Sequence, residues 1–188
     1  MTFKFNIRRT HIKKEIKLSD YAQIIYEAFR PGILLNTQAK KFNSMVIGWG
    51  NLGVTFGIPT FAVYVRQRRF TKSQLDASQE FTLSVPLDGG DPEIIRICGT
   101  LSGYDCDKEK EAGLTLVPPS MNKTPGIKEY PLTLECRVLT QADINFRDLP
   151  QNLQDRYYPQ DVPGDHTGAN QDAHTMYLGE ILEAYLIQ

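Results

Sequence analysis

The chain is 188 residues long, which is the usual size of one domain and enough to enclose a hydrophobic core. Its 21 Lys and Arg residues nearly balance 22 Asp and Glu residues, so no overall field attracts nucleic acid or acidic lipid. No apolar run approaches the roughly 20 residues of a membrane span, and residues 1–9 contain no signal-peptide core. The cysteines Cys98, Cys106 and Cys136 lack C-x-x-C spacing, so neither a disulfide framework nor a zinc ribbon is indicated. We therefore expect one domain over residues 1–188, cytoplasmic, with no nucleic-acid or membrane partner.

The first half of the chain alternates short β-prone runs with two helical stretches. Residues 1–17 alternate basic with apolar positions and predict an edge strand or an arm. Apolar residues at helical spacing predict a helix over residues 19–29, which a Pro-Gly pair ends. Thr71 and Gln74 fit a T-x-x-Q capping box, so a second helix is expected to begin at Thr71 and to include residues 72–79. The predicted strands are residues 33–35, 43–47, 61–65 and 81–85.

The second half of the chain adds further short elements of both kinds. Asp91 and Pro92 form a good helix start, and Gly99 is expected to end that helix. In residues 132–138, apolar residues alternate with polar ones, which are expected to face away from the core. The other predictions are strands at 114–117 and 176–187, helices at 108–112 and loosely at 146–158, and a polar surface flap at 159–173. Many short strands with few helices predict a mainly β fold, an antiparallel barrel with helical insertions.

Basic residues are concentrated at one point, where the predicted strand 61–65 ends. Arg66, Arg68 and Arg69 precede the predicted helix start at Thr71. The first turn of a helix offers unpaired N–H groups and a partial positive charge, and guanidinium groups add paired donors that suit phosphate. This combination predicts an anion pocket, most simply for phosphate. The alternative is a solvated basic turn, because charged runs usually lie on the surface.

The segment Gly48–Gly53 matches the G-x-G-x-x-G pattern of dinucleotide-binding folds. That fold requires a helix that starts at the glycines. Residues 54–59 are instead β-prone and are then interrupted by glycine and proline. We therefore reject a Rossmann fold.

A set of motifs in a fixed order resembles the flavin reductase-like family, whose fold is the FMN-binding split barrel. The first three motifs are N-S-M-x-x-x-W-G-x-L-G from Asn43, P-x-x-x-V-Y-V-R-x-x-R-F-T from Pro59 and E-F-T-L-S-V-P from Glu80. The other three are C-G-T-x-S-G-x-D-x-D-K from Cys98, L-E-C-R from Leu134 and H-x-M-Y-L-G-E-I from His174. The set spans about residues 30–185 and implies a mainly β split barrel of the FMN-binding type with a few short helices. The chain departs from the family at Phe56–Pro59, Tyr104 and Thr175, which bears on substrate preference.

The resemblance also implies where FMN binds. The isoalloxazine ring is expected to lie against backbone groups of Asn43, Ser44, Met45 and Val46. The phosphate is expected to bind Arg66, Arg69 and Thr71, in a pocket that Ser102, Gly103 and Lys108 complete. The remaining expected cofactor-binding residues are Trp49, Gly50 and His174.

Some of these side chains also allow other interpretations. Trp49 either stacks near a ring system or packs in the core, and His174 either approaches the flavin or bonds to backbone at a strand end. Asp165, His166 and Asp172 precede His174 and can bind metal, but their spacing matches no known ligand pattern, so we predict no metal. Neither a Ser-His-Asp order nor a carboxylate pair stands out, and we name no catalytic residue.

The resemblance implies an NAD(P)H:flavin oxidoreductase or a flavoredoxin-like electron carrier, with NADH or NADPH as donor. It also implies a homodimer with flavin at the interface. Hydride transfer to flavin needs alignment and exclusion of water and no protein acid or base, so the missing triad is expected. The alternatives are a non-enzymatic flavin carrier or sensor, and a structural barrel that has lost its ligand.

Overall fold

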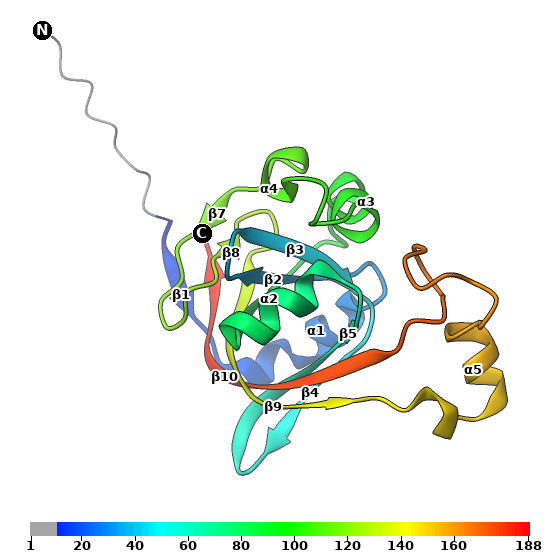
Figure 1. The fold of residues 1–188 in the computed structure, drawn as a ribbon. Coiled ribbons are helices and arrows are strands. Elements are labelled where there is room, and N and C mark those ends of the chain that lie inside the picture. Colours follow the sequence, from blue (N-terminus) through cyan, green and yellow to red (C-terminus); the bar gives the residue numbers. More distant parts are fainter. Residues whose placement is uncertain (1–10) are drawn as a thin grey trace, which may run out of the picture.

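The computed structural model describes residues 11–188, and its fold is an antiparallel β-structure surrounded by short helices (Figure 1). Eight strands form one sheet in the order β3-β2-β6-β9-β10-β5-β4, with β1 paired to β10, and β7 pairs with β8 separately. Every pairing is antiparallel. The mainly β class is therefore confirmed. The part of the predicted arm in residues 1–10 lies outside the described residues.

The strands vary widely in length, and the two longest, with 12 and 14 residues, are neighbours in the sheet. They are β1 (Lys13–Glu15), β2 (Ile33–Gln38), β3 (Phe42–Ile47), β4 (Gly50–Thr55), β5 (Ile58–Arg66), β6 (Glu80–Val85), β7 (Leu116–Val117), β8 (Gly126–Ile127), β9 (Leu132–Asp143) and β10 (His174–Ile187). The α-helices are α1 (Ala22–Ala28), α2 (Phe70–Ser78), α3 (Pro92–Thr100), α4 (Lys108–Glu111) and α5 (Gln151–Tyr157). The 3₁₀ helices are η1 (Leu18–Tyr21) and η2 (Phe146–Asp148).

The core lies inside the curved sheet and follows the two-residue period of its strands. Phe61, Val63 and Val65 alternate along β5 and are fully buried, together with Phe81 of β6 and Tyr177 of β10. Alternate side chains of a strand point to one face, so one face of β5 supplies a continuous apolar surface. Helix α1 closes one side of this core with its buried residues Ile25 and Ala28.

Part of the polar face of β9 is also buried, which the alternation in its sequence did not predict. Glu135 lies between Leu134 and Cys136 and is fully buried. Its carboxylate accepts hydrogen bonds from the backbone N–H groups of Ser120, Met121 and Asn122 at 2.7–3.1 Å, and from the hydroxyl of Tyr185 at 2.8 Å. The polar residues lie opposite the apolar ones as predicted, and the loop before β8 buries Glu135, whereas Arg137 on the same face is exposed.

The predicted capping box is also wrong. Helix α2 begins at Phe70, with Arg69 as its N-cap and no side-chain capping bond. The hydroxyl of Thr71 instead accepts a hydrogen bond from Asn43 Nδ2 at 2.9 Å, and the side-chain amide of Gln74 binds backbone groups of the β2–β3 turn. Both side chains thus join α2 to the sheet.

Of two predictions that rest on glycines, the structure contradicts one and confirms the other. Gly99 does not end α3, which continues to Thr100, so that prediction was wrong. The residues after Gly48 and Trp49 form β4, a strand and not a helix, which confirms the rejection of a Rossmann fold. Because β3 and β4 are the two ends of the hydrogen-bonded order, one edge of β3 has no strand partner in the described sheet.

The β4–β5 hairpin turns through two residues with positive φ, Phe56 (φ 56°) and Gly57 (φ 78°). Such a turn favours Asn-Gly, and a left-handed conformation costs most L-residues roughly 1–2 kcal/mol. The ring of Phe56 is 80% exposed and contributes little packing. We therefore expect Phe56→Asn to raise the free energy of unfolding by about 0.5–1 kcal/mol in urea titrations. Phe56→Ala, which removes the ring and keeps the strain, should leave it nearly unchanged; a loss of stability in Phe56→Asn would contradict this account.

Candidate functional site

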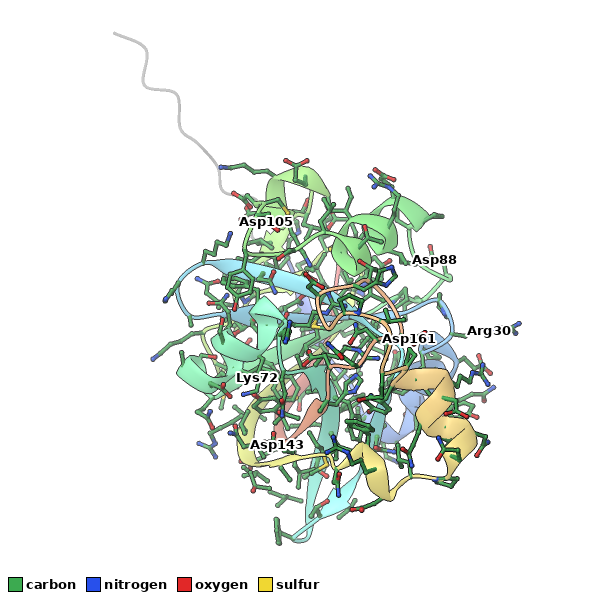
Figure 2. The ribbon with its side chains drawn as sticks, turned by 45° about the vertical axis from the view of Figure 1, so that its right-hand side comes forward. Arg30, Lys72, Asp88, Asp105, Asp143 and Asp161 are labelled. Carbon is green, nitrogen blue, oxygen red and sulfur yellow. The ribbon has the colours of Figure 1, made fainter. Side chains whose placement is uncertain are left out.

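A cleft of about 620 Å³ lies beside the free edge of β3. Its walls come from β3, the start of α2, the turn after α3 and the flap, by which we mean residues 159–173. Figure 2 shows the flap, marked by Asp161, between the α3 and α5 segments. The predicted site residues that line this cleft are Asn43, Met45, Val46, Trp49, Arg66, Arg69, Thr71, Ser102, Gly103, Lys108 and His174.

Two predicted residues, Ser44 and Gly50, do not line the cleft. The carbonyl of Ser44 accepts a hydrogen bond from Lys108 behind it. Gly50 lines a second cavity of about 800 Å³ on the other side of Trp49. A Cβ on Gly50 would lie 2.7 Å from the ring of Phe61 and 2.8 Å from that of Phe29, so close packing requires glycine here. Both residues therefore support the site from outside it.

Lys108 is the most unusual side chain of the cleft, because it is a buried ammonium group. It is 4% exposed, and its Nζ donates to the carbonyls of Ser44 at 2.9 Å and Cys98 at 3.0 Å. An ammonium has three N–H donors, so one remains after these two bonds. Burial lowers the pKa of Lys108, and nearby Arg69 lowers it further. Within residues 11–188 no carboxylate forms an ion pair with Lys108.

Asn43, Thr71 and Gly103 meet at the floor of the same end of the cleft. Asn43 is buried and donates its Nδ2 to Thr71, while its Oδ1 has no hydrogen-bond partner among the described residues. A Cβ on Gly103 would clash with Asn43 Oδ1 and lie 2.5 Å from the ring of Phe70. Only glycine allows the turn after α3 to approach β3 and α2 this closely.

The start of α2 adds positive potential to this end of the cleft. Phe70 and Thr71 line it, and α2 has no side chain that caps its first N–H groups. Free N–H groups at a helix start favour anions. The guanidinium of Arg69 lies beside them, and its one side-chain hydrogen bond to residues 11–188 is long, 3.4 Å, to the carbonyl of His166 in the flap. Lys108, Arg69 and the start of α2 thus surround one end of the cleft with positive charge.

The side chain of Arg66, unlike that of Arg69, is buried and bonded to several backbone carbonyls. Arg66 is 8% exposed, and its guanidinium donates to the backbone carbonyls of Asn170, at 3.2 Å, Asp172 and Tyr157, at 2.8 Å. All three acceptors lie in or beside the flap. The described contacts of Arg66 therefore fix the flap to the end of β5.

The other end of the cleft is aromatic, and the guanidinium groups of Arg66 and Arg156 lie over its Tyr158 and Tyr157 rings. The ring of His174 lies 4.8 Å from that of Trp49, and Tyr157 packs edge-on against Trp49 at 5.1 Å. His174 Nδ1 shares a 2.8 Å hydrogen bond with the hydroxyl of Tyr158. Burial, together with the charges of Arg66 and Arg69, lowers the pKa of His174 to about 3. The imidazole is therefore neutral at ordinary pH.

Two metal-capable side chains near the start of β10 each form a hydrogen bond with a different partner. Asp172 Oδ2 accepts from the backbone N–H of Arg68 at 2.8 Å, and His174 bonds to Tyr158. Within residues 11–188 no group of three or more His, Cys, Asp or Glu side chains is arranged to hold a metal ion. In the same part of the chain, no helix is long and apolar enough to span a membrane.

A family model described as the flavin reductase like domain matches residues 30–188, most of the chain. The chain belongs to the flavin reductase-like family. A curated relative, an uncharacterized protein of Archaeoglobus fulgidus, is 31% identical over 110 residues. That alignment covers 58% of this chain and 61% of the relative, so the match spans less than two thirds of the relative's length.

Solved structures of the family share the split-barrel fold of this flavin reductase-like domain. Flavoredoxin from Methanosarcina acetivorans superimposes with a TM-score of 0.61 at 20% identity, over 99% of this chain and 74% of that one. The FMN-binding domain of a flavin reductases-like enzyme from Shewanella baltica gives 0.59 at 16% identity, over 94% and 78%. An NADH:FAD oxidoreductase from Streptomyces globisporus gives 0.60 at 15% identity, over 88% and 83%. The predicted FMN-binding split-barrel fold is confirmed.

Several aromatic residues in or beside this cleft were not predicted from the sequence. Phe70 and Tyr104 pack edge-to-face at 4.9 Å beside Gly103, and Tyr157 and Tyr158 contact the Trp49 and His174 rings. Tyr104 sits in the Cys98–Lys108 motif, so its position pointed to the cleft. Tyr157 and Tyr158 are the last residues of the loosely predicted helix 146–158, and no local pattern marks them.

The neutral state of His174 predicts acid sensitivity. The folded pKa of about 3 lies below the ordinary 6.5, so between these values only the unfolded chain takes up this proton. Stability therefore falls as pH drops from about 6.5 toward 3, by up to about 1.4 kcal/mol per pH unit. His174→Asn keeps an acceptor for the Tyr158 hydroxyl and should show a smaller loss between pH 6.5 and 4.5 in urea titrations. Equal losses in both proteins would contradict the buried neutral imidazole.

Proposed function

We propose that the protein is an FMN-binding oxidoreductase, acting as an NAD(P)H:flavin reductase or as a flavoredoxin-like electron-transfer protein. The observation that carries this proposal is Lys108, a buried ammonium in the cleft that no carboxylate of residues 11–188 neutralises. A buried charge without a partner is costly, so the cleft favours an anionic ligand. The phosphate of FMN has the required charge and accepts several hydrogen bonds.

The groups around Lys108 are hydrogen-bond donors of the kinds that bind phosphate. Arg69 offers a guanidinium, Phe70 and Thr71 offer the first N–H groups of α2, and Gly103 leaves room for a ligand to approach the backbone. Ser102 lines the same wall. In this proposal these residues and Lys108 hold the phosphate, while Arg66 acts on the flap.

The free edge of β3 fits the ring. Met45 and Val46 line the cleft on this edge, and among the described strands β3 pairs with β2 alone. Apart from the Ser44 carbonyl, which accepts from Lys108, its outer backbone groups can therefore meet a planar ring with donors and acceptors. Trp49 and the neutral His174 form an aromatic, uncharged wall at the same end. These residues would orient the ring and exclude water from one side of it.

Bound FMN supplies the hydride and electron chemistry of such a protein. The residues of this chain bind, orient and desolvate, and no proton-transfer residue is needed. NADH or NADPH is the proposed donor; a structural neighbour from Streptomyces globisporus bears the name NADH:FAD oxidoreductase. Three free thiols agree with a reducing compartment such as the cytoplasm.

We also propose a homodimer with flavin at its interface. Trp49 lines both the cleft and the second cavity and is 39% exposed, while Tyr26, which lines that cavity, is 78% exposed. A second copy over this region would complete the exposed side of the cleft. Size-exclusion chromatography with light scattering should report twice the mass of 21.3 kDa. A monomer that binds FMN fully would contradict the shared site.

The phosphate assignment predicts a difference between two ligands. Arg69→Ala should weaken FMN by about tenfold, because a charge-assisted hydrogen bond contributes roughly 1.5–3 kcal/mol and Arg69 is only half-buried. Riboflavin, which lacks the phosphate, should bind both proteins alike. Quenching of flavin fluorescence measures both affinities. Lys72→Ala is the matched control, because Lys72 is a cation in the first turn of α2, close to Arg69, but its charge is paired with Asp76.

The same preparation distinguishes the competing functions. Oxidation of NADH or NADPH in the presence of FMN, above a protein-free blank, supports the reductase. Bound FMN without oxidation supports an electron carrier or sensor. A wild-type protein that neither carries nor quenches FMN would contradict the proposed function altogether.

A further inference from the structure

We infer that Arg66 is a positioning residue whose guanidinium holds the flap against the end of β5 and so forms the aromatic end of the cleft. This inference deepens the proposed function and rests on it only for the ligand measurements. The family pattern and the sequence both suggested a phosphate contact for Arg66, and the hydrogen bonds point elsewhere.

The three acceptors of Arg66 bracket the flap from both ends. The carbonyl of Tyr157 ends α5 just before the flap, and those of Asn170 and Asp172 lie close to its return to β10. The planar guanidinium presents five N–H donors in a fixed fork, whereas an ammonium presents three donors on a single atom. One side chain therefore ties the entry of the flap to its exit.

Hydrogen bonds within the flap and to the residues beside it give the flap a defined conformation. Asn170 is fully buried, donates to the carbonyls of His166 and Gly168, and accepts from the backbone N–H of Asp172. Asp172 also accepts from the backbone N–H of Arg68. Loss of Arg66 would leave the carbonyls of Tyr157, Asn170 and Asp172 without this partner in a buried setting, so the flap should loosen.

Tyr157 and Tyr158, just before the flap, connect it to the aromatic end of the cleft. Tyr157 packs on Trp49 at 5.1 Å, Tyr158 bonds to His174, and the Arg66 guanidinium lies 5.3 Å over the Tyr158 ring. The ring wall proposed for flavin is thus held by the same residues that Arg66 anchors. The effect of Arg66 on ligand binding should therefore concern the ring and not the phosphate.

The decisive variant is Arg66→Lys, with Arg66→Ala beside it. Lysine keeps the positive charge and loses the multiple directed bonds. If Arg66 positions the flap, both variants weaken FMN and riboflavin by the same factor, about fivefold or more. If Arg66 binds phosphate, Arg66→Ala weakens FMN alone and Arg66→Lys stays close to wild type, which would overturn the inference. Arg137→Ala, an exposed arginine of β9 paired with Glu180, is the control.

Two readouts test the flap without flavin. Trp49 is the only tryptophan of the chain, so its emission should shift to longer wavelength in both Arg66 variants. An Asp-specific protease should cut at the exposed Asp161 or Asp165 at least tenfold faster than in wild type or Arg137→Ala. Guanidinium ion at millimolar concentration should partly restore the emission of Arg66→Ala. Unchanged emission and cleavage in a folded Arg66→Lys protein would overturn the inference, even if wild type binds no FMN.

Discussion

The buried ammonium of Lys108 is the contact on which the arrangement of the cleft depends. It reaches from α4 to the carbonyls of Ser44 in β3 and Cys98 in α3, and thereby joins three elements behind the site. Two carbonyl dipoles satisfy its donors in part but leave its charge without a counterion in the described chain. Since a ligand that binds only the folded state stabilises it, the anion that completes this site also strengthens the fold. Binding and stability are coupled through one side chain.

The local part of this site could be predicted from the sequence, because its components are neighbours in the chain. A strand end, the arginines after it and the start of α2 occupy one short stretch, and the structure places Arg69 and Thr71 in the cleft as that stretch suggested. The alternation in β5 and the β-prone residues after Gly48 were equally local. These features depend on backbone geometry and strand period, which act over a few residues.

The remainder depended on contacts that no local pattern contains. The acceptors of Arg66 are 91 to 106 residues away, so its role at the flap could not be distinguished from that of Arg69. Thr71 and Gln74 have the composition of a capping box but bind Asn43 and the β2–β3 turn. Glu135 has the position of an outward residue but is covered by a distant loop. In each case a polar side chain found a better partner through the tertiary fold than its neighbours in the chain offered.

The cleft is polarised along its length, and this polarity sets the orientation of any ligand that enters it. Lys108, Arg69 and the start of α2 gather positive charge at one end. Burial, together with the charges of Arg66 and Arg69, lowers the pKa of His174 and keeps it neutral at the other end beside Trp49. An anionic group is therefore favoured at the first end, where the ammonium of Lys108 and the free N–H groups of α2 converge, and a flat ring is favoured at the second, where aromatic side chains form the wall. A phosphate tail joined to a planar ring matches both ends in one orientation, because the helix start and the buried ammonium lie at the first end.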